Sequence, residues 1–259
     1  MFLERFIFLL KITMHYLNLN KVNEEVKRIF IPFSDEILNV DNENILSIAL
    51  YGSAVSPDYV VGKSDINSLF VFKEYNFDIF KRCCAIYKKA AKRMISPPLF
   101  LSPSMIDESV DVFPMEFSEI KDCNILIFGE DFFKDLNISY EHLRLQCEQQ
   151  IKGRLLLLGQ AFLETGRNGK RIEMLMVESI SSIFPILRSA LKLKGIDVPS
   201  SKDEIISLVE KNFEIENSIM RDILKDKKGD GKIGRFNAEN AFSKYFNEIT
   251  KIALIINEL

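Results

Sequence analysis

The sequence has few of the residues that build most metal and redox sites. Its 259 residues include two histidines, His15 and His142, and four cysteines, none of which form a CxxC pair. Zinc sites need several such ligands at close spacing, so a zinc centre is not expected. We expect all four cysteines to be reduced thiols in a cytoplasmic protein. They are Cys83, Cys84, Cys123 and Cys147.

The chain also lacks a positive net charge and a long uninterrupted apolar run. Its formal net charge is −3, which argues against a protein that holds long nucleic acid on a broad basic face. The apolar start of the chain is broken by Glu4, Arg5 and Lys11 and is too short to span a bilayer. We therefore expect residues 1–20 to be an amphipathic extension, and no membrane partner.

Hydrophobic patterning predicts a sheet with helices in the first half of the chain. Short aliphatic runs at 45–51 and 124–129, and the run at 66–73, predict buried strands. A further strand is expected over 111–120. Helical spacing predicts helices at 22–39, with a kink or break at Pro32, and at 77–94. Residues 21–135 are thus expected to form a mixed α/β domain.

After Gly129 the apolar residues recur every three or four positions, as on the buried faces of helices. This pattern predicts an all-helical bundle over 136–259, and hence an α+β protein with two domains. Residues 201–204 (SKDE) match a capping box at the start of one of these helices. The helices are expected at 140–163, 170–194, 201–212, 214–226 and 237–258.

The stretch LYGSAVSPDYVVGKSDINSLFVF, residues 50–72, places polar groups at the ends of two expected strands. Gly52 allows a sharp turn and close approach of a ligand, and Ser53 offers a hydroxyl and an N–H group beside it. Asp65 and Asn67 are two residues apart on a strand, so they point to the same face. Their oxygens could share one hard cation.

A third oxygen ligand is expected from the strand predicted over 111–120. Glu116 lies on the face opposite the aromatic row of that segment, and Asp111 is the rival candidate on the other parity. Each of these residues also has an ordinary explanation as a turn, cap or exposed acid. A cation-binding site is favoured because all these residues are expected at the same edge of one sheet.

The order of Gly52-Ser53, a gap of about a dozen residues, Ser64-Asp65-Ile66-Asn67 and a later acid resembles the DNA polymerase β-like nucleotidyltransferase superfamily. The small bacterial members with a helical C-terminal domain, of the kanamycin type, are the most similar. The resemblance implies a nucleoside triphosphate, expected to be ATP, and Mg²⁺. It implies transfer of a nucleoside monophosphate to a hydroxyl of a small molecule or protein.

The resemblance also implies residue roles. Gly52, Ser53 and Ser64 would contact the triphosphate. Lys63 could steer phosphate or could simply be a solvated loop lysine. Asp65, Asn67 and Glu116 would hold metal, with Asp65 and Glu116 central to catalysis.

Asn67 departs from the family pattern, because an acid is usual at its position. An amide oxygen can bind Mg²⁺ but brings no charge, so a second catalytic metal would be held weakly. Three interpretations stay open: an active enzyme with a weakened metal site, a nucleotide-binding or protein-interaction module that has lost catalysis, and a chance turn.

On the helix expected from residue 140, Arg144, Glu148 and Lys152 form a row at four-residue spacing. This row could be a solvated ladder of ion pairs. It could also face the nucleotide, with Glu148 orienting or deprotonating the acceptor and Lys152 touching phosphate. The expected partners are the nucleotide and the hydroxyl acceptor, and a homodimer is left open.

Overall fold

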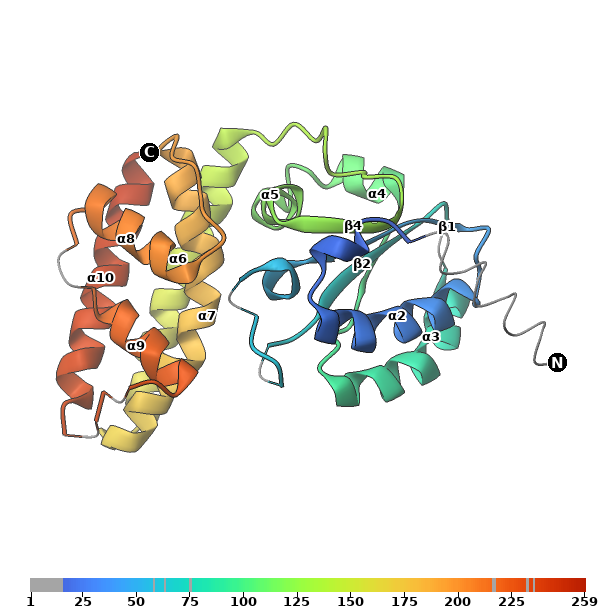
Figure 1. Ribbon diagram of the computed structural model, residues 1–259. Helices are drawn as coiled ribbons and strands as arrows, with labels where there is room; N and C mark the ends of the chain where they lie inside the picture. The colour runs from blue at the N-terminus through green and yellow to red at the C-terminus, as the bar shows by residue number, and fades with distance from the viewer. Residues whose placement is uncertain are drawn as a thin grey trace. The chain divides into compact units, whose positions relative to one another are not determined.

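The computed structural model describes residues 16–57, 59–62, 64–74, 76–215, 218–231, 233–234 and 236–259 (Figure 1). The chain forms two compact units. The first contains the described residues up to Val110 together with Glu116–Asn137, and the second contains Asp111–Met115 and Ile138–Leu259. The predicted α+β class is confirmed. Most of the predicted N-terminal extension, up to His15, lies outside the described residues.

A four-stranded mixed sheet organises the first unit. Its strands are β1 (Ile45–Tyr51), β2 (Asn67–Phe72), β3 (Leu99–Leu101) and β4 (Asn124–Gly129), in the order β3-β2-β1-β4. Strand β1 runs antiparallel to both β2 and β4, whereas β3 pairs with β2 in parallel. The end of β1 therefore lies beside the beginnings of β2 and β4, which brings three loops to one sheet edge.

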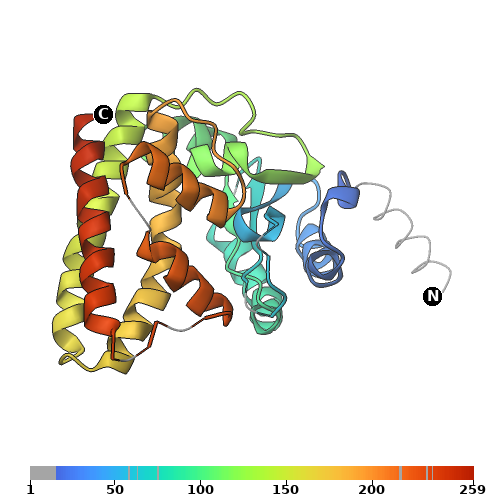
Figure 2. The same cartoon turned by 60° about the vertical axis from the view of Figure 1, so that its left-hand side comes forward.

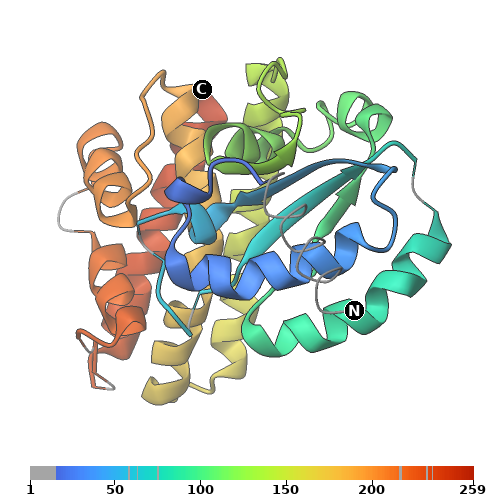
Figure 3. The same cartoon turned by 45° about the vertical axis from the view of Figure 1, so that its right-hand side comes forward.

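Helices cover both faces of this sheet (Figures 1 and 3). On one face pack α2 (Glu24–Leu38) and α3 (Phe77–Ala90), with buried side chains such as Phe30, Phe70 and Cys83 in one apolar cluster. On the opposite face lie α4 (Pro103–Glu108) and α5 (Pro114–Asp122). Helix α2 continues through Pro32, so the break considered from the sequence does not occur.

The strand predicted over 111–120 is wrong, because this segment forms helix α5. Phe117 and Ile120, three residues apart, are buried, while Glu116, which directly precedes Phe117, is exposed. That burial follows the helical period. Pro114 is the first residue of the helix, a position where its missing N–H costs nothing. Strand β3 was not predicted.

The described residues after Ile138 form five helices in the second unit, which are visible in Figure 2. The predicted helices are all present. Ser201 precedes α8, but its side chain makes no capping hydrogen bond, so the predicted capping box does not form. The helices are α6 (Tyr140–Glu164), α7 (Gly169–Leu193), α8 (Lys202–Asn212), α9 (Ile219–Lys228) and α10 (Ala238–Glu258).

Helix α7 is the centre of this bundle. It packs against α6, α8, α9 and α10 and contributes buried residues along its whole length, from Ile172 to Leu191. Among the described helices, it alone has the length and composition of a membrane span. Half of its most apolar stretch is buried within the protein, as expected of a core helix.

Candidate functional site

Three polar side chains lie next to one another where β1 ends. Tyr51, the last residue of β1, pairs with Asn67 at the start of β2 and with Asn124 at the start of β4. Directly paired residues point to the same face of a sheet. The row Asn67–Tyr51–Asn124 therefore lies on the face covered by α4 and α5, at the edge where Gly52 follows.

Gly52 turns the chain at this edge. Its φ of +66° is in the left-handed region, and it begins the short 3₁₀ helix η2 (Gly52–Val55). A Cβ on residue 52 would come within 3.1 Å of the amide nitrogen of Asn67. The left-handed φ therefore favours glycine at residue 52, and a side chain there would also force the Asn67 side-chain amide to shift.

Ser53 and Ser64 hold the loops of the site. The Ser53 hydroxyl donates to the backbone carbonyl of Asp65 at 2.9 Å, which ties the turn after β1 to the segment before β2. The Ser64 hydroxyl accepts from the N–H of Val60 at 3.0 Å, which closes the 60–64 loop. Both serines therefore have structural roles here, and their predicted contacts with phosphate stay predictions.

Asp65 is exposed at the entrance to β2. Within the described residues, no hydrogen bond or ion pair engages its carboxylate. Ile66 pairs with Ile95 and is buried in the cluster beneath α2 and α3, so Asp65 and Asn67 on either side of it turn to the other face. The structure thus brings Gly52, Ser53, Asp65 and Asn67 together. Lys63 lies outside the described residues.

Glu116 is not where the sequence predicted it. It is exposed in the first turn of α5 and is not a strand residue, and the rival Asp111 lies in the turn before that helix. Strand β3, which neighbours β2, consists of Leu99, Phe100 and Leu101 and carries no acid. The predicted strand-borne third acid is therefore wrong.

The remaining donors fit one hard cation better than two. Asp65 offers a carboxylate and Asn67 an amide oxygen, and Mg²⁺ is commonly held by one or two carboxylates together with substrate phosphates. In the described part of the chain, no three His, Cys, Asp or Glu side chains form a group that could hold a metal. The residues thus suit a single Mg²⁺ that arrives with a nucleotide.

Tyr51 and Asn124 were missed from the sequence. Burial, and to a lesser extent the nearby carboxylate of Glu119, together raise the pKa of Tyr51 to about 12. Its phenol therefore stays protonated at neutral pH. Asn124 donates from Nδ2 to the Ile120 carbonyl at 2.9 Å. Tyr51 ends one predicted strand and Asn124 begins another, but only the antiparallel register, which the sequence did not reveal, places them in one row with Asn67.

The row on α6 forms the ion-pair ladder considered from the sequence. Glu148 accepts from Arg144 at 2.8 Å and from Lys152, and Lys152 also donates to Asn257 at 3.2 Å. These contacts lower the pKa of Glu148, with the Lys152 hydrogen bond the largest cause. A lowered pKa makes a carboxylate a weaker base. The catalytic role of Glu148 and the phosphate contact of Lys152 stay predictions.

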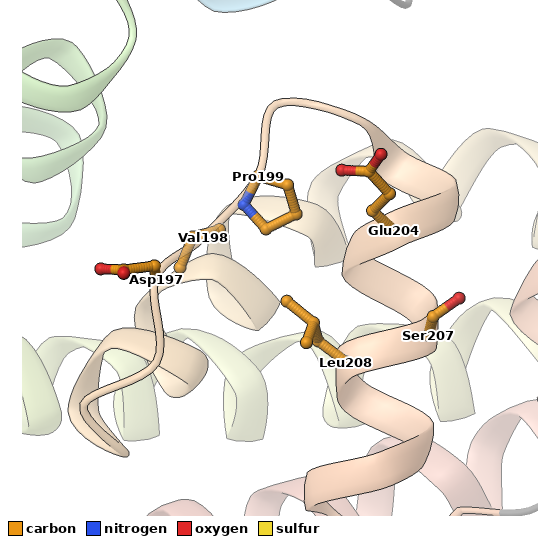
Figure 4. Close-up of a pocket in the computed structure, with 6 residues that line it drawn as sticks. All are labelled: Asp197, Val198, Pro199, Glu204, Ser207 and Leu208. Carbon is orange, nitrogen blue, oxygen red and sulfur yellow. The ribbon is translucent and has the colours of Figure 1, made fainter.

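A shallow pocket lies elsewhere, in the second unit (Figure 4). Its volume is about 480 Å³, and it lies between the 197–199 loop and α8. It contains none of the predicted site residues. Its lining consists of Asp197, Val198, Pro199, Glu204, Ser207 and Leu208.

Comparison with known proteins identifies a shared fold. No protein-family model matches the chain, and no curated protein matches it. Among solved structures, the chain is similar to spectinomycin adenyltransferase AAD(9) from Enterococcus faecialis, determined with ATP and spectinomycin. The TM-score is 0.56 and the sequence identity 12%, over 85% of this chain and 98% of that one. At this identity the likeness shows that the chain has the fold of an adenyltransferase.

Proposed function

We propose that the first unit binds a magnesium-bound nucleoside triphosphate, expected to be ATP, and that the protein transfers its nucleoside monophosphate to a hydroxyl acceptor. The observation that carries this proposal is the meeting of Gly52, Asp65 and Asn67 at one sheet edge. Support also comes from the shared fold with an adenyltransferase that was determined with ATP and an acceptor.

Each residue would contribute a distinct property. Gly52 has no side chain, so a phosphate could approach its peptide groups closely. Asp65 supplies the charged oxygen and Asn67 a neutral one for a single Mg²⁺ that the nucleotide also binds. When bound, Mg²⁺ would offset the charge of the phosphoryl oxygens. The four described cysteines are free, which is compatible with the cytoplasmic location that we propose.

The test is transfer from labelled ATP with Mg²⁺ to a panel of hydroxylated small molecules and to proteins. We expect a labelled product with the wild type and its loss in Asp65→Ala. The control variant is Glu116→Gln, an exposed acid on α5. Transfer that is equal in the wild type and Asp65→Ala would refute the assignment of Asp65.

A second candidate function is nucleotide binding without transfer. It is favoured by Asn67, which leaves one carboxylate beside Gly52, and by the absence of an acid on the described strand β3. The Asn67→Asp substitution separates the two functions, since it restores the charge usual in the family. Binding of ATP without transfer in the wild type and in Asn67→Asp would establish the second candidate.

A further inference from the structure

We infer that Glu119 of α5 is a further metal-binding residue of the candidate site, and that it takes the part predicted for Glu116. This inference rests on the proposed function, because it adds a second carboxylate to the same magnesium–nucleotide site. The sequence alone predicted no role for Glu119.

The position of α5 on the sheet is the first observation. Asn124 belongs to the polar row at the end of β1, and its Nδ2 donates to the carbonyl of Ile120 in the last turn of α5. The chain passes from Asp122, the end of α5, to Asn124, the start of β4, through one residue. The last turn of α5 is therefore fixed beside the row.

The orientation of that turn is the second observation. Phe117 and Ile120 are buried, while Glu119 is half-buried and Glu116, one turn earlier, is exposed. Glu119 also lies close enough to Tyr51 for its charge to act on the phenol. Tyr51 pairs with Asn67 and directly precedes Gly52 in the chain. Of the two glutamates, Glu119 is thus the one near Tyr51.

The chemistry of the site gives Glu119 its role. Asp65 alone supplies one negative charge to a divalent cation, and Asn67 supplies none. A second carboxylate from α5 would balance the remaining charge, and hard cations favour such oxygen donors. Asp65, from the loop before β2, and Glu119, from α5, would then hold the metal together with the nucleotide phosphates.

The experiment measures Mn²⁺ binding to the full chain by electron paramagnetic resonance, with Mn²⁺ in place of Mg²⁺ and with a non-hydrolysable ATP analogue. The variants are Glu119→Gln, Asp65→Asn and the matched control Glu116→Gln. We expect Glu119→Gln and Asp65→Asn each to raise the Kd for Mn²⁺ by at least about tenfold, because each removes a ligand charge. Glu116→Gln should stay within about twofold of the wild type.

The outcomes distinguish this inference from the proposed function. If Asp65→Asn weakens Mn²⁺ binding but Glu119→Gln behaves like Glu116→Gln, Glu119 is not a ligand and the proposed function stands. If the wild type binds neither Mn²⁺ nor the analogue, both fail. Should Glu119→Gln unfold, Glu119→Ala replaces it, since it also removes the charge of the carboxylate. Unchanged Mn²⁺ affinity in a folded Glu119→Ala would then overturn the inference.

Discussion

Asp65 and Glu148 are both acids that the sequence proposed for one site, yet their surroundings differ. Glu148 accepts from Arg144 and Lys152, so its charge is balanced by neighbours on its own helix. Asp65 is exposed two residues before Asn67, which pairs with the protonated Tyr51, and no described cation pairs with its carboxylate.

This difference shows which of the two carboxylates would gain electrostatic stabilisation from a bound cation. A carboxylate that already has two cations gains little from a bound metal, whereas an unpaired one gains an attractive charge. The sheet edge of the first unit therefore offers a carboxylate whose charge no described side chain balances, whereas the ladder on α6 has the features of a helix-stabilising network. The predictions below test this contrast in order of expected effect.

The largest effect is expected at Gly52. In Gly52→Ala the residue keeps an unfavourable φ, which costs about 1–2 kcal/mol, and its Cβ also meets the Asn67 amide. We expect ATP binding to weaken by at least about tenfold, which is about 1.4 kcal/mol. Calorimetric titration measures this change.

The matched control is Gly62→Ala. Gly62 has a φ of +74° and nothing within 4 Å of its would-be Cβ, so the two variants share the backbone strain only. We expect Gly62→Ala to bind ATP like the wild type. Equal loss of binding in both variants would mean that strain, and not the Gly52–Asn67 contact, controls the site.

The next effect, which concerns stability at alkaline pH and not ligand binding, is expected from Tyr51. Its pKa is raised to about 12 in the folded protein, first by burial and then by Glu119, so the folded state holds this proton more tightly than the unfolded state. The resulting stability is complete below pH 10 and is lost as pH rises towards 12. The loss amounts to about 2 kcal/mol.

Tyr51→Phe removes this titration. Denaturant unfolding between pH 9 and 12 should therefore show a shallower decline of the free energy of unfolding in the variant than in the wild type. Parallel declines would show that Tyr51 is not held protonated by its surroundings.

The smallest effect is expected at Glu148. Glu148→Gln removes two partly exposed ion pairs on α6, so we expect a shift in the melting temperature of less than about 2 °C and unchanged ATP affinity. Differential scanning calorimetry and titration measure both. A tenfold loss of ATP affinity would instead favour the role of Glu148 in the site.

The helices of the second unit could be predicted because their apolar residues follow the helical period over many turns. The predicted 140–163 and 170–194 differ by one residue at the ends from α6 and α7. The 111–120 segment is too short for the spacing of its apolar residues to distinguish a helix from a strand. Its alternating apolar residues suggested a strand. Pro114 was the overlooked signal, because a central strand excludes proline and a first helical turn accepts it.

The candidate site could be predicted only in part, for a related reason. Gly52, Ser53, Asp65 and Asn67 lie within one hairpin-like segment, so their meeting follows from sequence order. Glu119 and Asn124 reach the same edge only through the pairing of β4 with β1. That pairing depends on tertiary packing across more than seventy residues, which no local pattern specifies.

The measurement that tests the central claim most directly is calorimetric titration of ATP into the wild type and Asp65→Ala, with and without Mg²⁺. The account predicts binding to the wild type that is stronger with Mg²⁺, and loss of this magnesium-dependent gain in Asp65→Ala. Equal affinity of the two proteins under both conditions would contradict it.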